Sequence, residues 1–135
     1  MNFEMEEDRD LTACEAVIMK AVWEAEEDLS VMELRQILRN RFGKDYAPTT
    51  VRTFLVMLSD KGFVRTYRIK KNAYVHALKD EKAYKAAQLQ KQADFWYNGS
   101  AADLICTMFQ ASTLSREERD KIRGYLDDWD HELDV

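Results

Sequence analysis

Helix start and stop signals divide residues 11–78 into a fixed order of elements, and this order limits the possible folds more than any other feature of the chain. Three sequences of the form Ser/Thr-x-x-Glu begin at Thr12, Ser30 and Ser115. In such a capping box the hydroxyl accepts a hydrogen bond from a backbone N–H near the helix start, and the glutamate carboxylate reaches back to the capping residue. Each sequence therefore predicts the start of a helix.

Apolar spacing extends the first two of these starts into short helices. After Thr12, apolar residues recur at helical intervals up to the acidic run over 24–28, where the helix is expected to end. After Ser30 they recur at intervals of three and four as far as Phe42, and Gly43 stands where a left-handed C-terminal cap belongs. The sequence predicts one helix from Thr12 and a second from Ser30 to Gly43.

The only proline opens a third helix. Pro48 suits a first helical turn, where its missing N–H costs no hydrogen bond. Val51, Leu55 and Leu58 then form one apolar face, and Gly62 ends the helix. Only a brief turn separates this helix from the one before it, so the two form a helix-turn-helix pair.

A β-hairpin is predicted directly after the third helix. Residues 63–69 and 73–78 are rich in aromatic and β-branched residues, which favour strands. Lys70, Lys71 and Asn72 separate the two runs and form a basic tip. Three short helices followed by a hairpin are the order of elements in a winged helix-turn-helix.

The C-terminal part reads as helices over 80–96, 101–111 and 115–133, with a break at 98–100. The last helix carries an apolar stripe, and the tail contains no further segment that could bury it. Such a stripe suits dimerisation. The stripe consists of Ile122, Leu126, Trp129 and Leu133.

The predicted fold is therefore mainly α with a small β-hairpin wing. We expect a winged helix-turn-helix domain over 11–78 and a helical dimerisation domain over 79–135. One Pro and four Gly among 135 residues are too few for a loop-rich or all-β fold.

Charge is divided unevenly along the chain. The net charge is −5, but residues 29–78 hold ten Lys or Arg against three acids, net +7, whereas residues 1–10 hold five acids and one base, net −4. The basic stretch is a candidate surface for a polyanion. Alternatively, the basic stretch is an ordinary fluctuation of charge along a mixed-charge surface. Charge alone does not distinguish a polyanion-binding surface from such a fluctuation.

Several classes of protein are excluded. No run approaches the roughly 18 apolar residues of a membrane span, and the chain begins with acids instead of the basic start of a secretory signal. We expect a cytoplasmic protein without membrane contact. Cys14 and Cys106 have apolar neighbours and are expected to be buried free thiols. His76 and His131 form no metal-binding spacing, and no glycine-rich phosphate cradle is present. The sequence therefore predicts no enzyme, metal or cofactor.

The third helix has an outer face suited to reading DNA bases. With Val51, Leu55 and Leu58 inward, the outer face holds Thr49, Arg52, Thr53 and Met57. Threonine can hydrogen-bond to base edges or contact a thymine methyl, and arginine reaches guanine or phosphate in the major groove. We expect Thr49, Thr50 and Thr53 to read bases. Arg52 is expected either to read a base or to hold a phosphate. A solvated helix face is the alternative.

The hairpin supplies cations for the phosphate backbone. Arg65, Arg68, Lys70 and Lys71 are suited to phosphate contacts, which set affinity and register without reading sequence. Lysines at a hairpin tip also protect sheet edges from pairing, and the two roles are compatible.

Three stretches resemble one known family. Residues 15–23 are similar to its Glu-x-x-Val-Met-Lys-x-Leu-Trp, residues 48–62 to its Ser-Pro-x-Thr-Ile-x-Thr-Leu-Leu run that ends in Lys-Gly, and residues 96–100 with 114–118 to its Phe-Phe-Gly-Gly-Ser and Leu-Ser-x-Glu-Glu. The chain thus resembles the penicillinase-repressor family (BlaI/MecI/CopY) of bacterial transcription regulators from about Leu11 to Trp129.

The resemblance implies a homodimer that represses transcription from a palindromic operator in double-stranded DNA. It implies that the C-terminal helices form the dimer and that Thr49, Thr50 and Thr53 contact the operator. Known members are released by a regulatory protease that cuts the C-terminal region, or by metal binding to cysteines in the copper branch.

This sequence departs from the family at several positions. Met57 stands where the family frequently has an arginine. Ala47 replaces the serine that would cap the third helix, and this loss of a cap lowers helix stability by about 1 kcal/mol. The cysteine pairs of the copper branch are missing, and no asparagine precedes Phe109, where other members are cut. The acidic residues 1–10, the missing arginine and the negative net charge keep a second hypothesis open: a winged-helix protein-interaction module without DNA binding.

Overall fold

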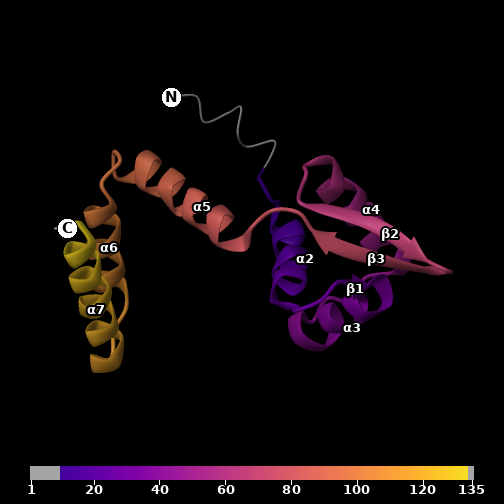
Figure 1. The fold of residues 1–135 in the computed structure, drawn as a ribbon, viewed down its shortest axis with the longest axis horizontal. Helices are drawn as coiled ribbons and strands as arrows, with labels where there is room; N and C mark the ends of the chain where they lie inside the picture. Colours follow the sequence, from indigo (N-terminus) through magenta and orange to yellow (C-terminus); the bar gives the residue numbers. More distant parts are fainter. Residues whose placement is uncertain (1–9, 134–135) are drawn as a thin grey trace. The chain divides into compact units, whose positions relative to one another are not determined.

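The computed structural model describes residues 10–133, in which six helices and three strands are present. The chain divides into two compact units, one that runs to Lys85 and one that starts at Ala86. The first unit holds the small sheet and the helices α2 (Ala13–Glu24), α3 (Val31–Phe42) and α4 (Pro48–Asp60). The second holds α6 (Ala101–Ala111) and α7 (Arg116–Leu133), and α5 (Glu81–Trp96) spans the division (Figure 1). The fold class predicted from the sequence, mainly helical with a hairpin wing, is confirmed.

The first two helices begin and end where their signals predict. α2 covers Ala13–Glu24 and α3 covers Val31–Phe42. Both have complete capping boxes, because Thr12 and Ser30 accept from the N–H groups of Glu15 and Glu33, whose carboxylates accept from the capping residues in return. Gly43 closes α3 in the left-handed conformation, with φ of 66°.

α4 (Pro48–Asp60) is the second helix of the helix-turn-helix pair. Val51, Leu55 and Leu58 are buried, as their spacing predicts. Ala47 provides no side-chain cap, which confirms the loss expected from its missing hydroxyl.

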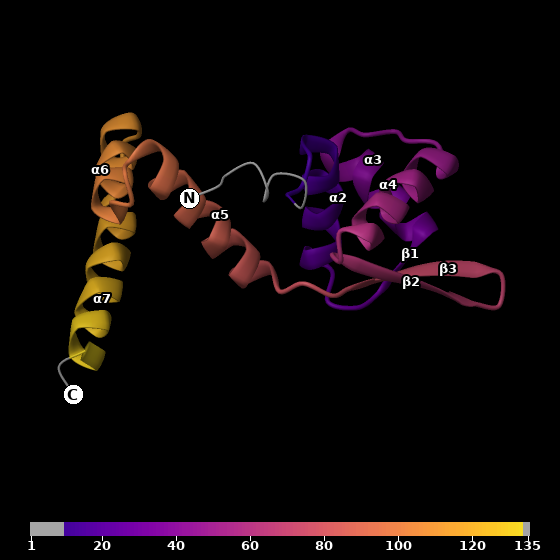
Figure 2. The ribbon, with the colours of Figure 1, turned by 90° about the horizontal axis from the view of Figure 1, so that it is seen from above.

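The sheet has one strand more than the sequence predicts. β2 (Val64–Ile69) and β3 (Asn72–Ala77) form the expected antiparallel hairpin, which extends beyond the helices in Figure 2. β1 (Leu29–Ser30) pairs with β3, so the strand order is β1-β3-β2. A two-residue strand leaves no periodic pattern in the sequence, so it could not be predicted. The turn consists of Lys70 and Lys71, since Asn72 already belongs to β3.

A single apolar core holds the first unit together. Its fully buried side chains come from all three helices and from both hairpin strands, and β1 adds Leu29. The members with no exposed surface are Ile18, Met19, Leu34, Leu38, Val51, Leu58, Phe63, Val64 and Val75.

An aromatic cluster fixes the start of α5 on this unit. The ring of Tyr84 lies 5.2 Å from that of Phe63 and 5.6 Å from that of Trp23, measured between centroids. The indole N–H of Trp23 donates to the carbonyl of Lys79 at 3.0 Å, and the Tyr84 hydroxyl accepts from the N–H of Leu11 at 3.3 Å. The first turn of α5 therefore belongs to the core.

The second unit is helical but scarcely buried. α6 (Ala101–Ala111) begins at Ser100 and α7 (Arg116–Leu133) follows Ser115, and each serine hydroxyl accepts from the N–H three residues later. Neither α6 nor α7 has a buried residue.

The prediction that the cysteines are buried is wrong, although both are free thiols. Cys14 on α2 and Cys106 on α6 are both exposed. Apolar neighbours in sequence misled the prediction, because adjacent helical residues point about 100° apart and do not share a face. None of the helices in residues 10–133 is long and apolar enough to cross a membrane.

Candidate nucleic-acid interface

Three of the four predicted reading residues lie on the side of α4 that faces away from the core. Thr49, Arg52 and Thr53 are exposed, while Thr50 is half-buried. The opposite side of the same helix is anchored by Val51. Because the core fixes the rotation of α4 about its axis, the first three side chains are held outward.

Thr53 has a more limited role than its residue type suggests. Its hydroxyl donates to the backbone carbonyl of Thr49 at 3.0 Å. The single hydroxyl proton is therefore in use, and the oxygen lone pairs and the methyl group are free to contact a ligand. In a major groove such a group accepts a hydrogen bond from the amino group of adenine or cytosine, or contacts a thymine methyl.

The turn before α4 is held by a residue that the sequence reasoning missed. Arg35 on α3 donates from Nε to the carbonyl of Tyr46 at 3.1 Å, and the Tyr46 ring packs on Phe54 of α4 at 5.5 Å between centroids. These contacts position the helix start, which lacks a side-chain cap. Arginine spacing alone contains no sign of this contact, because it joins α3 to a loop carbonyl.

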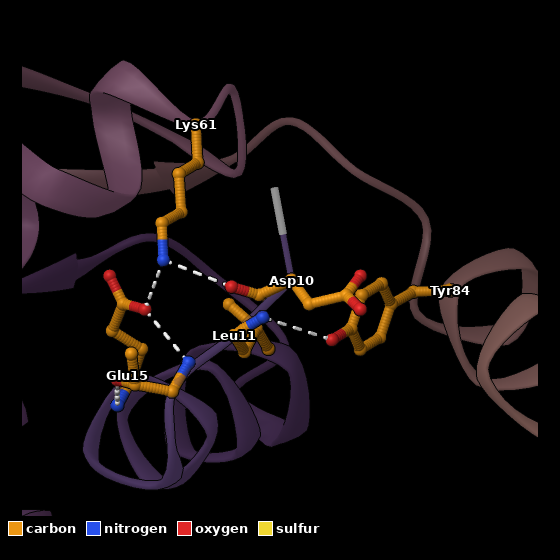
Figure 3. Close-up of polar contacts among 6 residues, drawn as sticks. Asp10, Leu11, Glu15, Lys61 and Tyr84 are labelled. Carbon is orange, nitrogen blue, oxygen red and sulfur yellow. Dashed lines mark hydrogen bonds and ion pairs between the residues drawn. The ribbon is translucent and has the colours of Figure 1, made fainter. Parts of the chain in front are cut away.

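The other end of α4 is anchored by a buried ion pair (Figure 3). Lys61, which follows the last turn of α4, donates to Oε1 of Glu15 at 2.6 Å and to the carbonyl of Asp10 at 2.9 Å. The Glu15 side chain has no exposed surface, and its Oε2 lacks a hydrogen-bond partner. Burial by itself raises the pKa of Glu15, but the hydrogen bonds from Lys61 and Thr12 outweigh it, so the pKa lies below 4.5.

The two arginines of β2 lie on opposite faces of the hairpin. Side chains alternate along a strand, so Arg65 and Arg68, three positions apart, cannot share a face. Arg68 lines a cleft between the hairpin and α4 together with Arg52 and Val56. Arg65 instead lies 5.2 Å over the ring of Tyr67. Of the two arginines, Arg68 is the one that shares a cleft with a predicted reading residue, Arg52.

The hairpin tip adds a further cation to the surroundings of α4. Lys71 lines a cleft that Arg52 and the first turn of α3 also line. Lys70 is exposed and adopts a left-handed conformation with φ of 57° in the turn. The structure thus gathers Arg52, Arg68 and Lys71 around one side of α4, with Lys70 at the end of the wing.

The cations of this region have no acidic partners. Within residues 10–133, no ion pair is formed by Arg52, Arg68, Lys70 or Lys71, whereas Lys20, Arg41, Lys61 and Lys85 each pair with a glutamate. Unpaired cations keep their full attraction for an external anion. Part of the positive charge expected over residues 29–78 is therefore available for binding near the outer face of α4, whereas Arg41 and Lys61 of the same stretch are already paired.

A polar cluster at the base of the wing was not predicted. Asp28 accepts from the Tyr67 hydroxyl at 2.7 Å and lies 2.8 Å from Nδ1 of His76. The contact to His76 is the main cause that lowers the pKa of Asp28, and the hydrogen bond to Asp28 raises the pKa of Tyr67. Tyr67 also stacks on Tyr74 at 5.6 Å, so its hydroxyl serves the fold.

The predicted dimerisation residues are placed on one side of α7 and remain largely uncovered within the single chain. Leu126, Trp129 and Leu133 are 58%, 62% and 67% exposed, and Ile122 is half-buried. Across residues 10–133, no three His, Cys, Asp or Glu side chains converge to form a metal site.

Known proteins match the chain in sequence and in fold. The family model described as penicillinase repressor matches residues 11–128. The solved complex structure of hsRosR-S4 is 19% identical with a TM-score of 0.53, covering 95% of this chain and 96% of that one. The hsRosR-S1 complex is 20% identical with a TM-score of 0.51, covering 94% and 98%. Comparison with curated protein sequences finds no match.

Proposed function

We propose, from the premise that this chain belongs to the penicillinase repressor family, that it is a homodimeric transcriptional repressor of the cytoplasm. In this proposal it binds a palindromic operator in double-stranded DNA with sequence specificity. Each copy inserts the outer face of α4 into the major groove of one half-site, and the hairpin β2–β3 contacts the flanking phosphates.

The observation that carries the proposal is the unpaired positive charge around α4. Arg52, on the exposed face of α4, shares one cleft with Arg68 and another with Lys71, and none of the three has an acidic partner within residues 10–133. Phosphate contacts of this kind supply affinity, and short polar side chains on the helix supply base discrimination.

The dimer is supported by the apolar stripe of α7. A large apolar side chain such as Trp129 gains about 1.5–3 kcal/mol when it moves from water into an interface. A second copy of α7 offers the same stripe in return, as a two-fold interface requires.

Binding to promoter DNA across a salt series tests the phosphate contacts. The logarithm of the binding constant should fall with the logarithm of salt concentration by about 0.9 per phosphate neutralised. The double variant Lys70→Ala/Lys71→Ala should lower this slope without changing which sequence is preferred. Lys20→Ala is the matched control, because Lys20 is an exposed lysine already paired with Glu24.

Selection of bound DNA from a random pool tests the reading residues. Thr53→Val keeps the shape of the side chain but removes the oxygen acceptor, and it should cost about 1–3 kcal/mol of discrimination at one base pair. Thr107→Val is the matched control, because Thr107 on α6 also donates its hydroxyl to the carbonyl four residues earlier. Equal loss on all sequences would contradict the assignment of Thr53 as a reader.

Absence of DNA retention at low salt, together with capture of a protein partner, would instead support the winged-helix interaction module. Met57 at the position of the family's arginine and the net charge of −5 are the features that would then explain the loss of DNA binding.

A further inference from the structure

We infer that Val56 reads the methyl group of a thymine in each half-site, and that it is the main apolar specificity contact of α4. This inference rests on the proposed DNA-binding function and adds to it the chemistry of one base pair. Val56 was not among the residues that the sequence singled out.

Val56 lies on the same strip of α4 as the polar readers. At about 100° per residue, it stands about 20° from Thr49 around the helix axis, with Arg52 to one side and Thr53 to the other. All four side chains point away from the core. Val56 is 60% exposed and lines the cleft that also holds Arg52 and Arg68. A contact that reaches Arg52 and Thr53 therefore also covers Val56.

The residue type is unusual for an exposed helix position. A β-branched side chain loses rotamer freedom in a helix and is a weaker helix former than alanine, lysine or glutamate. Most of the Val56 side chain gains nothing from packing within the chain, since Val56 is 60% exposed whereas Val51 on the inner face has no exposed surface. Its rigid pair of methyl groups is therefore suited to contact an apolar group of a bound molecule.

Duplex DNA offers one apolar group in the major groove, the C5-methyl of thymine. The arginines and threonine beside Val56 satisfy polar base edges and phosphates, and the isopropyl group cannot do either. Val56 and its polar neighbours are therefore complementary to a step in which a thymine lies next to a hydrogen-bonding base pair.

The test uses the operator obtained by selection, with each thymine replaced singly by deoxyuridine. This change removes the methyl group and keeps every hydrogen-bonding atom. One buried methyl group is worth about 0.8 kcal/mol, so at one thymine of the half-site the wild-type protein should bind about fourfold more weakly. Val56→Ala should bind the thymine operator about fourfold more weakly or worse, and should bind the thymine and deoxyuridine operators equally.

Met57→Ala is the matched control, because Met57 is also an exposed apolar residue of α4, about 100° further around the helix. It should keep the fourfold sensitivity to deoxyuridine. Thermal unfolding of both variants checks that they fold. The inference is overturned if no thymine is sensitive, if sensitivity survives in Val56→Ala, or if Met57→Ala abolishes it. Failure to select any operator at all would instead overturn the proposed function.

Discussion

The two units of the molecule bury their apolar residues to very different extents. Residues 10–85 have a core of fourteen buried apolar residues, whereas among residues 86–133 only Ala93 is a buried apolar residue. Leu34 in the first unit has no exposed surface, and Trp129 in the second is 62% exposed. The difference indicates that the first unit is held together by its own core, and it supports the proposal that a second copy of the chain covers the apolar stripe of α7.

The largest expected effect comes from a charge in the apolar stripe of α7. Leu126→Glu or Trp129→Glu should give monomers, because burying an unpaired carboxylate costs more than the apolar contact gains. A monomer loses the second half-site, so operator affinity should fall by about 10²–10⁴-fold. Sedimentation and operator binding are the measurements.

Asp127→Ala is the control for this change, because Asp127 lies on α7 outside the stripe. It should stay dimeric and keep its operator affinity. A dimeric Trp129→Glu protein would show that the stripe is not the interface and would remove the explanation offered for the exposed residues of the second unit.

The next prediction compares a leucine-to-alanine substitution in each of the two units. Leu34→Ala removes a fully buried side chain and should lower the free energy of unfolding by about 3 kcal/mol, at any protein concentration. Leu126→Ala removes a side chain that is 58% exposed in the single chain, so its effect should depend on protein concentration. Urea unfolding at two protein concentrations separates the two. Equal and concentration-independent losses would contradict the difference between the units.

The first unit was predictable from sequence because its signals are local. Capping residues, apolar spacing and the lone proline act within one helix, so α2, α3 and α4 appear at the expected residues. Contacts between distant segments left no such pattern. The pair Lys61–Glu15, the bond from Arg35 to Tyr46 and the short strand β1 depend on the assembled fold. Within the site, the separation of Arg65 from Arg68 follows from the alternation of the predicted strand, but which of the two faces α4 depends on the assembled fold.

A smaller effect is expected from the ion pair that holds the end of α4. Lys61→Met keeps most of the side-chain bulk but leaves the Glu15 carboxylate buried without its cation. Because Lys61 is 18% exposed, we expect a loss of roughly 2 kcal/mol, below the 3–5 kcal/mol of a fully buried pair. Lys20→Met is the control, since its exposed pair with Glu24 should contribute under about 1 kcal/mol.

The pH dependence of this variant gives a second measurement. In the wild-type protein the pKa of Glu15 is lowered, so the ionised pair stabilises the fold above pH 4.5 and the contribution is lost as the pH falls. Without the hydrogen bond and the charge of Lys61, the pKa of Glu15 should rise from its wild-type position. The difference in stability between wild type and Lys61→Met should therefore shrink in acid. A difference that stays constant with pH would show that lost packing, not charge, causes the effect.

The smallest effect concerns Asp28 at the base of the wing. Contacts with His76 and Tyr67 lower the pKa of Asp28 below 3.8. Its ionised form therefore contributes to stability above the unfolded pKa, and the contribution is lost as the pH falls through the folded pKa. The urea midpoint of the wild-type protein should fall more than that of Asp28→Asn between roughly pH 5 and pH 3. Asp127→Asn, in the second unit, should leave this acid transition unchanged, because the first unit carries its own stability. An equal change from both variants would mean that the two units unfold together.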